Sequence, residues 1–292
     1  MENEACERRR AAKWPLSAAL ALLLLLPAAH LHAQATKIFV ASTGNDANDG
    51  SRGSPKRNFQ PAHDAVAAGG QIVVLDTAGY GALSITKSLA VTVPPGVNGF
   101  VTVSGSANGI TVAAGANDIV TLRGLIVEGG SSNLGGFGIY VTSIGALTIE
   151  DCTVRNFALG IDLFSSTQVR VAIYNTAVRG CTYGLYASTN VSPYDRANAY
   201  TLAKGCRLEG CGRGAYLHGG GLVLDGCTVH GNSTGIQEDS GTVGVSNCTI
   251  TDNTTGVFNN SDSNTGAVGG LGNNTLEQNT NGNSFAVAFS LE

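Results

Sequence analysis

The chain has 292 residues, including 40 glycines and 7 prolines, and a formal net charge of −4 at pH 7. Its basic residues are few and scattered, so the sequence has no electrostatic footprint for nucleic acid or for an anionic membrane surface. The length is sufficient for one substantial hydrophobic core, and the high glycine content favours a fold made of turns.

The first 35 residues have the features of a secretory signal peptide. Four basic residues between positions 8 and 13 precede an apolar run from Leu16 to Leu26, and Ala33-Gln34-Ala35 offers small residues for cleavage. The apolar run is too short and wrongly flanked for a membrane anchor. We predict that residues 1–35 are removed and that the mature protein is secreted or periplasmic, with no membrane association.

Residues 36–71 are predicted to form an N-terminal cap. They hold a strand-like Ile38-Phe39-Val40, a stretch rich in Gly, Asn and Asp from Gly44 to Gly53, and a short helix from Phe59 to Ala68 whose apolar side covers the end of the core. The loop Asn45–Gly50 suggests calcium, but it lacks the spacing and the distal Glu of an EF-hand. Asx turns explain the loop better, so we expect no cofactor.

Residues 72–292 repeat one phrase of sequence. It reads Cys152-Thr153-Val154 and closes on Gly160-Ile161, and later copies begin near Cys206, Cys227 and Cys248 at steps of roughly 21 to 30 residues. Apolar and polar residues alternate within each copy, with no helical period, which indicates short strands. The repeat predicts a β-solenoid of roughly eight or nine coils, where a coil is one complete turn of the chain.

One inward column predicted from the alignment of the repeats consists of asparagines. Asn232, Asn253 and Asn279 fall in one turn position, which favours a ladder of buried side-chain amides. The alternative is glycosylation, because Asn232 and Asn253 begin acceptor sequons.

The six cysteines after residue 35 fall in inward positions, so we expect buried free thiols. Export and the even count leave disulfides open as the alternative, although neighbouring strands are ~4.8 Å apart and a disulfide prefers Cβ atoms ~3.8 Å apart. No zinc ligand set surrounds Cys206 and Cys211.

Two outward columns carry charges of both signs and are expected to be solvated ladders that stabilise the sheet. The first column is Arg123, Glu150, Tyr174, Lys204 and Asp225, and the second is Glu128, Arg155, Arg179 and Glu209.

The repeats resemble those of right-handed parallel β-helix proteins of the pectin lyase-like superfamily. The resemblance rests on Asn232-Ser233-Thr234-Gly235-Ile236 and Asn253-Thr254-Thr255-Gly256-Val257, each following a Cys-Thr-hydrophobic strand, and the segment from Phe39 to Tyr80 is similar to the cap of secreted bacterial members. It implies an all-β, single-stranded right-handed parallel β-helix with a short N-terminal capping helix. The superfamily includes pectate and pectin lyases, polygalacturonases, epimerases and non-catalytic surface proteins, so the resemblance leaves the reaction open.

One outward face differs from the rest of the repeat region. The strand after the closing Gly presents an aromatic column with a second, polar column two residues further along. The first column is Tyr140, Asp162, Tyr186, Tyr216, Gln237 and Phe258, and the second is Thr142, Phe164, Ser188, His218, Asp239 and Asn260. Aromatic rings beside polar groups form the kind of surface on which sugar rings stack. We predict that Tyr140, Asp162, Tyr186, Tyr216 and Gln237 bind a polysaccharide, bordered by long segments from Gly129 to Phe137 and from Ser188 to Tyr200. The resemblance also places the substrate cleft on this strand. The alternative is a plain exposed sheet face that uses Tyr for its strand propensity.

The catalytic motifs of the superfamily are missing. The turns before this face contain no pair of acids, and Asp162 and Asp239 are expected ~15 Å apart, beyond the ~5–9.5 Å of two-carboxylate glycoside hydrolysis. The one candidate proton-transfer couple is His218 with Asp239, predicted one coil apart at ~5 Å.

The sequence does not show whether the protein is an enzyme, and three functions are therefore considered. The first is a secreted β-helix that binds polysaccharide on its aromatic face. The second is a polysaccharide lyase or glycoside hydrolase that uses His218 and Asp239. The third is a structural or assembly protein whose last strand, with Phe285, Val287, Phe289 and Leu291 alternating, pairs with a neighbour.

Overall fold

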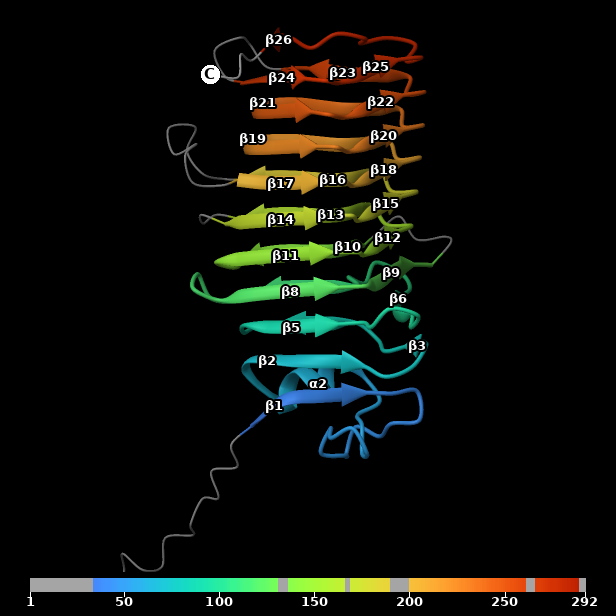
Figure 1. Ribbon diagram of the computed structural model, residues 1–292, viewed down its shortest axis with the longest axis vertical. Helices are drawn as coiled ribbons and strands as arrows, with labels where there is room; N and C mark the ends of the chain where they lie inside the picture. Colours follow the sequence, from blue (N-terminus) through green and yellow to red (C-terminus); the bar gives the residue numbers. More distant parts are fainter. Residues whose placement is uncertain (1–33, 131–135, 166–168, 190–199, 261–265, 289–292) are drawn as a thin grey trace, which may run out of the picture. The chain divides into compact units, whose positions relative to one another are not determined.

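The computed structural model describes residues 34–130, 136–165, 169–189, 200–260 and 266–288. The predicted signal peptide before residue 34, the central parts of the two long bordering segments, and Phe289 and Leu291 lie outside the described residues. The described chain is a solenoid of parallel strands, stacked in chain order from β1 to β26 (Figure 1). Within it, no helix is long and apolar enough to cross a membrane.

Each full coil contributes three strands, and each strand pairs with its equivalents one coil before and one coil after. The first strands are β1 (Ala35–Val40), β2 (Val66–Val74), β5 (Leu89–Thr92), β8 (Ile119–Arg123), β11 (Ala146–Glu150), β14 (Arg170–Tyr174), β17 (Tyr200–Lys204), the second halves of β19 (Arg213–Asp225) and β21 (Thr234–Ser246), β24 (Gly266–Gly272) and β26 (Val287–Ala288). The second strands are β3 (Ala78–Gly79), β6 (Gly99–Val103), β9 (Leu125–Gly129), β12 (Thr153–Arg155), β15 (Ala177–Arg179), β18 (Arg207–Glu209), β20 (Thr228–His230), β22 (Thr249–Thr251) and β25 (Thr275–Glu277). The third strands are β4 (Leu83–Ile85), β7 (Ile110–Ala113), β10 (Phe137–Ser143), β13 (Leu159–Ser165), β16 (Tyr183–Thr189), the first halves of β19 and β21, and β23 (Thr255–Asn259).

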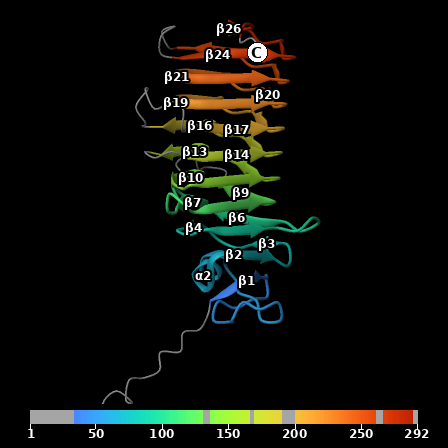
Figure 2. The ribbon, with the colours of Figure 1, turned by 60° about the vertical axis from the view of Figure 1, so that its left-hand side comes forward.

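The second strands form a nine-stranded sheet, which agrees with the eight or nine coils predicted from the repeat. Figure 2 shows the third strands β10, β13, β16 and β19 stacked in the same order. Between the first and second strands, one residue adopts a left-handed conformation in each of the seven coils from β8 onward. This position is taken by Gly, Asp or Asn: Gly124, Asp151, Asn175, Gly205, Gly226, Asn247 and Asn273, with φ between 47° and 75°. These are the residue types that tolerate positive φ, which explains why the repeat carries them before each marker residue.

The N-terminal cap differs from the prediction at two points. Its helix α2 (Phe59–Ala65) ends three residues before the predicted Ala68, because Val66 already begins β2. β2 pairs in parallel with β1, so the first sheet continues into the predicted cap. As predicted, the helix buries its apolar side, where Phe59 packs against Tyr80 with ring centroids 5.1 Å apart.

The Asn45–Gly50 loop is ordered by Asx turns and by a buried ammonium. Asn45 Oδ1 accepts from the Ala47 backbone at 2.9 Å, and Asp49 Oδ1 accepts from the Ser51 backbone at 2.9 Å. Lys56 is buried and its Nζ donates to the carbonyl oxygens of Asp46 and Asn48 at 2.9 and 2.7 Å. The lysine thus places a positive charge among these loop carbonyls.

The predicted asparagine ladder is confirmed. Nδ2 of Asn232 donates to Oδ1 of Asn253 at 2.9 Å, and Nδ2 of Asn253 donates to Oδ1 of Asn279 at 2.9 Å. The three side chains are buried, with 2–6 % of their surface exposed. Burial leaves the sequons of Asn232 and Asn253 without access for glycosylation.

All six cysteines of the described chain are free and buried. Several thiols donate to backbone carbonyls of the preceding coil, including Cys227 Sγ to Ala203 at 3.2 Å and Cys248 Sγ to Leu224 at 3.4 Å. Burial raises the pKa of the Cys152 thiol to about 12. The thiolate form of Cys152 is therefore disfavoured at neutral pH.

We expect iodoacetamide to leave these six thiols unmodified in the native protein and to label all six after unfolding without a reductant. The reason is that the native fold buries all six side chains and joins none of them in a disulfide. Intact-mass measurement counts the added groups. Protection of pairs of cysteines in the unfolded, unreduced protein would instead indicate disulfides.

Both predicted charge ladders are in register. Along the first column, Arg123 Nε lies 3.6 Å from Glu150, and Lys204 Nζ lies 2.9 Å from Asp225. Along the second column, Arg155 Nη2 lies 2.5 Å from the Glu128 carboxylate. Arg179 and Glu209 complete the second column on β15 and β18.

Candidate functional site

The aromatic column predicted from the sequence is confirmed by the strand register. Tyr140 pairs with Asp162, Asp162 with Tyr186, Tyr186 with Tyr216, Tyr216 with Gln237, and Gln237 with Phe258. These residues therefore occupy one line across β10, β13, β16, β19, β21 and β23, on the outward side of the third strands.

Three tyrosines of this region form one cluster. The rings of Tyr186 and Tyr216 have centroids 5.0 Å apart, and the ring of Tyr183 lies 5.5 Å from Tyr186 and 5.4 Å from Tyr216. All three side chains are half-buried, so part of each remains accessible to solvent. Tyr140 lies two coils away and stacks on Phe137 at 4.5 Å, outside this cluster.

Arg213 joins the tyrosine cluster to the polar side chains of β21. Its guanidinium carbon lies 4.9 Å from the ring centroid of Tyr183 and 5.6 Å from that of Tyr216. Its Nε donates to Gln237 Oε1 at 2.5 Å. The arginine is thereby held over the aromatic rings by cation–π contact and one hydrogen bond.

The sequence pattern does not single out Tyr183 or Arg213, which stand outside the two predicted columns. A signal for them was available, because each precedes a tyrosine of the aromatic column by three residues. Their positions on β16 and β19 pair directly.

Asp239 is held by three side chains of the same face. The Tyr216 hydroxyl donates to its Oδ2, while Gln237 Nε2 and Asn260 Nδ2 donate to its Oδ1 at 2.9 and 3.1 Å. Partial burial alone would raise the pKa of the Asp239 carboxyl, but these hydrogen bonds outweigh it and hold the pKa below its usual value. Burial and the bond to Asp239 raise the pKa of the Tyr216 hydroxyl. Asp239 is therefore a carboxylate at neutral pH, and Tyr216 is its neutral donor.

The register predicted for His218 is wrong. Asp239 is an extra residue in β21, and His218 pairs with Ser240 instead. Such a β-bulge re-aims the bulged side chain, and here it directs Asp239 to Tyr216. His218 is exposed, with its ring centroid 6.5 Å from that of Tyr216, and its charge contributes to the lowered pKa of Asp239. The proton-transfer role of the His218 and Asp239 couple stays a prediction.

Asp162 is buried, although its position in the column is an outward one. Only 3 % of its surface is exposed, and its Oδ1 has no hydrogen-bond partner. Burial raises the pKa of this carboxyl to about 7. Gln237 of the same column is also buried, so the column alternates between accessible rings and covered polar groups.

Glu238 is an acidic residue that sequence reasoning overlooked. It pairs with Leu217 and Asn259 in the inward column of the third strands, and its side chain is fully buried. The strand alternation was the available signal, since Ile236 is inward and Glu238 follows two residues later. A Cβ atom at Gly266 would lie 2.2 Å from Glu238 Oε1, so the core accommodates this acid only beside a glycine.

Asp162 and Asp239 are too far apart to act as a pair of catalytic carboxylates. Three strand pairings separate Asp162 from Gln237, the neighbour of Asp239, which corresponds to ~14 Å along the stack. Two-carboxylate glycoside hydrolysis uses separations of ~5–9.5 Å. This pair therefore has no such role.

Comparison with solved structures finds the same fold in one enzyme. A pectate lyase, Pel9A, matches with a TM-score of 0.62 and 16% sequence identity over 80% of this chain and 68% of its own. The A-module of the Azotobacter vinelandii mannuronan C-5 epimerase AlgE4 matches with a TM-score of 0.48 and 15% identity over 84% of this chain and 79% of its own.

No curated protein matches the sequence significantly. Residues 101–281, which are more than half of the chain, match the family described as "Right handed beta helix region". With the parallel solenoid and its asparagine ladder, this match shows that the chain belongs to the right-handed β-helix family and has the fold of the pectin lyase-like superfamily.

Proposed function

We propose that this protein is exported from the cytoplasm and binds a polysaccharide on the outward face of its third strands. The observation that carries the proposal is the cluster of Tyr183, Tyr186 and Tyr216 with Arg213 over two of the rings. Half-buried aromatic rings offer apolar faces to sugar rings at little entropic cost, because packing already fixes them.

Polar groups beside the cluster supply the hydrogen bonds that sugar hydroxyls require. Asp239 is an anionic acceptor at the edge of the tyrosine rings, and His218 is exposed next to Tyr216. The column continues with the exposed Phe258, along the direction in which an extended chain would lie across successive strands. The fold shared with a pectate lyase supports a carbohydrate ligand.

Tyr216→Ala and Tyr186→Ala are expected to weaken glycan binding by about 1 kcal/mol or more each, roughly fivefold in Kd. Each change removes an aromatic face from the cluster and leaves no cavity in the core. Binding is measured by calorimetry with the strongest ligand from an array of neutral, uronate-containing and sulfated glycans.

Two variants serve as controls for this experiment. Tyr186→Phe keeps the ring and should retain most of the affinity. Tyr174→Ala removes a half-buried tyrosine from a first strand, β14, and should leave binding unchanged. If both alanine variants of the cluster bind every glycan as wild type does, the proposal is wrong and a structural role takes its place.

A second candidate function, catalysis on the bound glycan, is favoured by Asp162 alone. A buried carboxyl with a pKa near 7 is suited to donate or accept a proton at neutral pH. Under this candidate, Asp162→Asn abolishes the release of reducing ends or unsaturated products and leaves binding intact. If wild type releases neither product from any bound glycan, this candidate is excluded and the binding function stands.

A further inference from the structure

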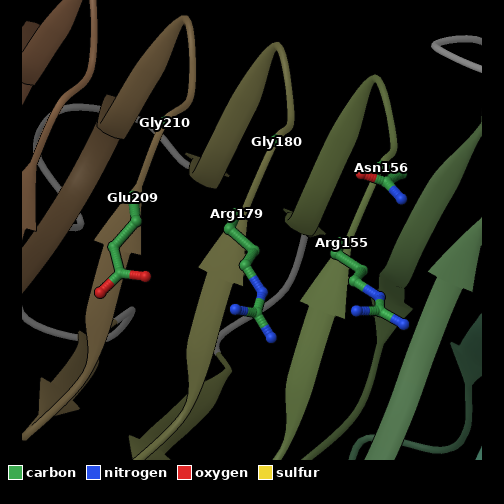
Figure 3. Close-up of a pocket in the computed structure, with 6 residues that line it drawn as sticks. All are labelled: Arg155, Asn156, Arg179, Gly180, Glu209 and Gly210. Atoms are coloured by element: carbon green, nitrogen blue, oxygen red, sulfur yellow. The ribbon is translucent and has the colours of Figure 1, made fainter. Parts of the chain in front are cut away.

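A second, independent site lies before the turns that lead into the aromatic face. It is an open groove of about 520 Å³ at the ends of β12, β15 and β18, lined by Arg155, Asn156, Arg179, Gly180, Glu209 and Gly210, and we name it the arginine groove. Figure 3 shows Arg155, Arg179 and Glu209 side by side on neighbouring strands, with their charged ends pointing the same way. The volume is within the range of small-ligand sites, although the groove is open to solvent.

The groove contains the positive charge of Arg179, which forms no ion pair within the described part of the charge ladder. Arg155 and Arg179 are direct neighbours on paired strands, an arrangement that costs energy for like charges. Arg155 is bound by Glu128, through Nε at 3.1 Å and Nη2 at 2.5 Å. Within the described residues, Arg179 has no ion pair or side-chain hydrogen bond, and its side chain is exposed.

Glu209 pairs in register with Arg179, but no ion pair joins these two described side chains. Its carboxylate lies 3.6 Å from Nε of Arg207, on its own strand. This contact involves Oε1 and is longer than a hydrogen bond, so Glu209 keeps acceptor capacity at the edge of the groove, and the guanidinium of Arg179 is available as a donor.

The turns beside the arginines keep the groove open. Gly180 and Gly210 occupy left-handed turn positions, with φ of 63° and 60°, and Asn156 occupies the equivalent position with φ of 63°. A Cβ atom at Gly210 would meet no atom within 4 Å, whereas one at Gly180 would lie 3.0 Å from Asn156 Oδ1. Glycine at these two positions adds no side chain to the lining of the groove beside Arg179.

We propose that the arginine groove binds the oxyanion of an acidic saccharide, with the carboxylate of a uronate sugar on Arg179 and a sugar hydroxyl on Glu209. The planar guanidinium is matched to the two oxygens of a carboxylate, and the bound charge offsets the repulsion between Arg179 and Arg155. Glu209 accepts from hydroxyl groups and repels densely charged anions, which favours a sugar acid over a polyphosphate. A sulfate ester presents the same oxyanion chemistry. The site stands on this geometry and does not require the proposed tyrosine surface.

The test is a titration of the mature protein with three probes of equal length: oligogalacturonate, its carboxyl-reduced neutral form, and a sulfated form of that neutral oligomer. We expect oligogalacturonate to bind wild type and Arg179→Gln to bind it about tenfold more weakly. Arg170→Gln changes the net charge equally at an exposed arginine of β14 and should bind as wild type does. The melting temperature of Arg179→Gln should change little, because the variant removes a like-charge contact with Arg155 and an opposite-charge contact with Glu209 together.

Every other result of this titration either supports the proposal or overturns it. Preferential binding of the sulfated oligomer, lost in Arg179→Gln, would support the oxyanion site and assign its ligand to sulfated saccharides. Failure of oligogalacturonate and of the sulfated oligomer to bind, equal binding of the neutral oligomer, or equal weakening in both arginine variants would overturn it. Loss of binding in Tyr216→Ala but not in Arg179→Gln would also overturn it, while supporting the tyrosine surface as the site.

Discussion

Asn253→Asp is expected to destabilise the protein by about 3 kcal/mol or more at neutral pH, among the largest effects of any single substitution in the repeat. Nδ2 of Asn253 donates to Asn279 Oδ1 and to the carbonyl oxygens of Val229 and Thr251, at 2.9 to 3.1 Å. A carboxylate at this position donates nothing and places negative charge against three acceptors in a site that is 2 % exposed. Urea unfolding of the two proteins measures the difference.

Asn281→Asp is the matched control for this prediction. Asn281 is an exposed asparagine of the last described coil, and its side chain makes no hydrogen bond there. The control should change the free energy of unfolding by less than about 0.5 kcal/mol. Equal stabilities of the two variants would contradict the buried ladder.

Asp162→Asn is expected to stabilise the protein at pH 8 by an amount on the order of 4 kcal/mol, and to have little effect at pH 4. Burial raises the pKa of Asp162 from its ordinary value of 3.8 to about 7. Between about pH 4 and pH 7, the folded protein therefore retains a proton that the unfolded chain releases. The stability of wild type falls as pH rises through this window and levels off above it, whereas the asparagine never ionises.

The difference between the two proteins isolates this one group, because all other ionisable groups are shared. Urea unfolding at pH 4.5, 6 and 8 should show a difference that grows with pH. If the difference in the free energy of unfolding were the same at every pH, Asp162 would be solvated and its pKa would not be shifted. Titration of its carboxyl carbon by NMR gives the same answer directly, with an expected midpoint near pH 7.

The fold and the positions of the columns were predictable because the repeated sequence aligns the equivalent positions of successive coils. Cys152, Thr176, Cys206, Cys227 and Cys248 mark the same inward position in five successive coils, and a fixed marker also fixes every position that follows it at constant spacing. For this reason the line from Tyr140 to Phe258 and the ladder through Asn253 were read correctly. Parallel in-register stacking converts sequence alignment into spatial contact.

The details of the candidate site were not predictable in the same way. The register predicted for His218 failed because the pairing shifts locally between Leu217 and Gly221, although the spacing on both sides is the same. Gly219, Gly220 and Gly241 adopt positive φ beside the bulge at Asp239. The burial of Asp162 depends on neighbouring side chains rather than on strand alternation. The position of Arg213 over two rings depends on side-chain packing that a repeat pattern does not encode.

The most direct test of the polysaccharide-binding surface is a fluorine NMR titration of the mature protein labelled with 3-fluorotyrosine. The chain has eight tyrosines, so single Tyr→Phe variants assign each signal. Addition of the strongest array glycan should shift the signals of Tyr183, Tyr186 and Tyr216 and leave those of Tyr80 and Tyr174 in place. Unchanged signals from the three clustered tyrosines at a glycan concentration that saturates binding would contradict the account.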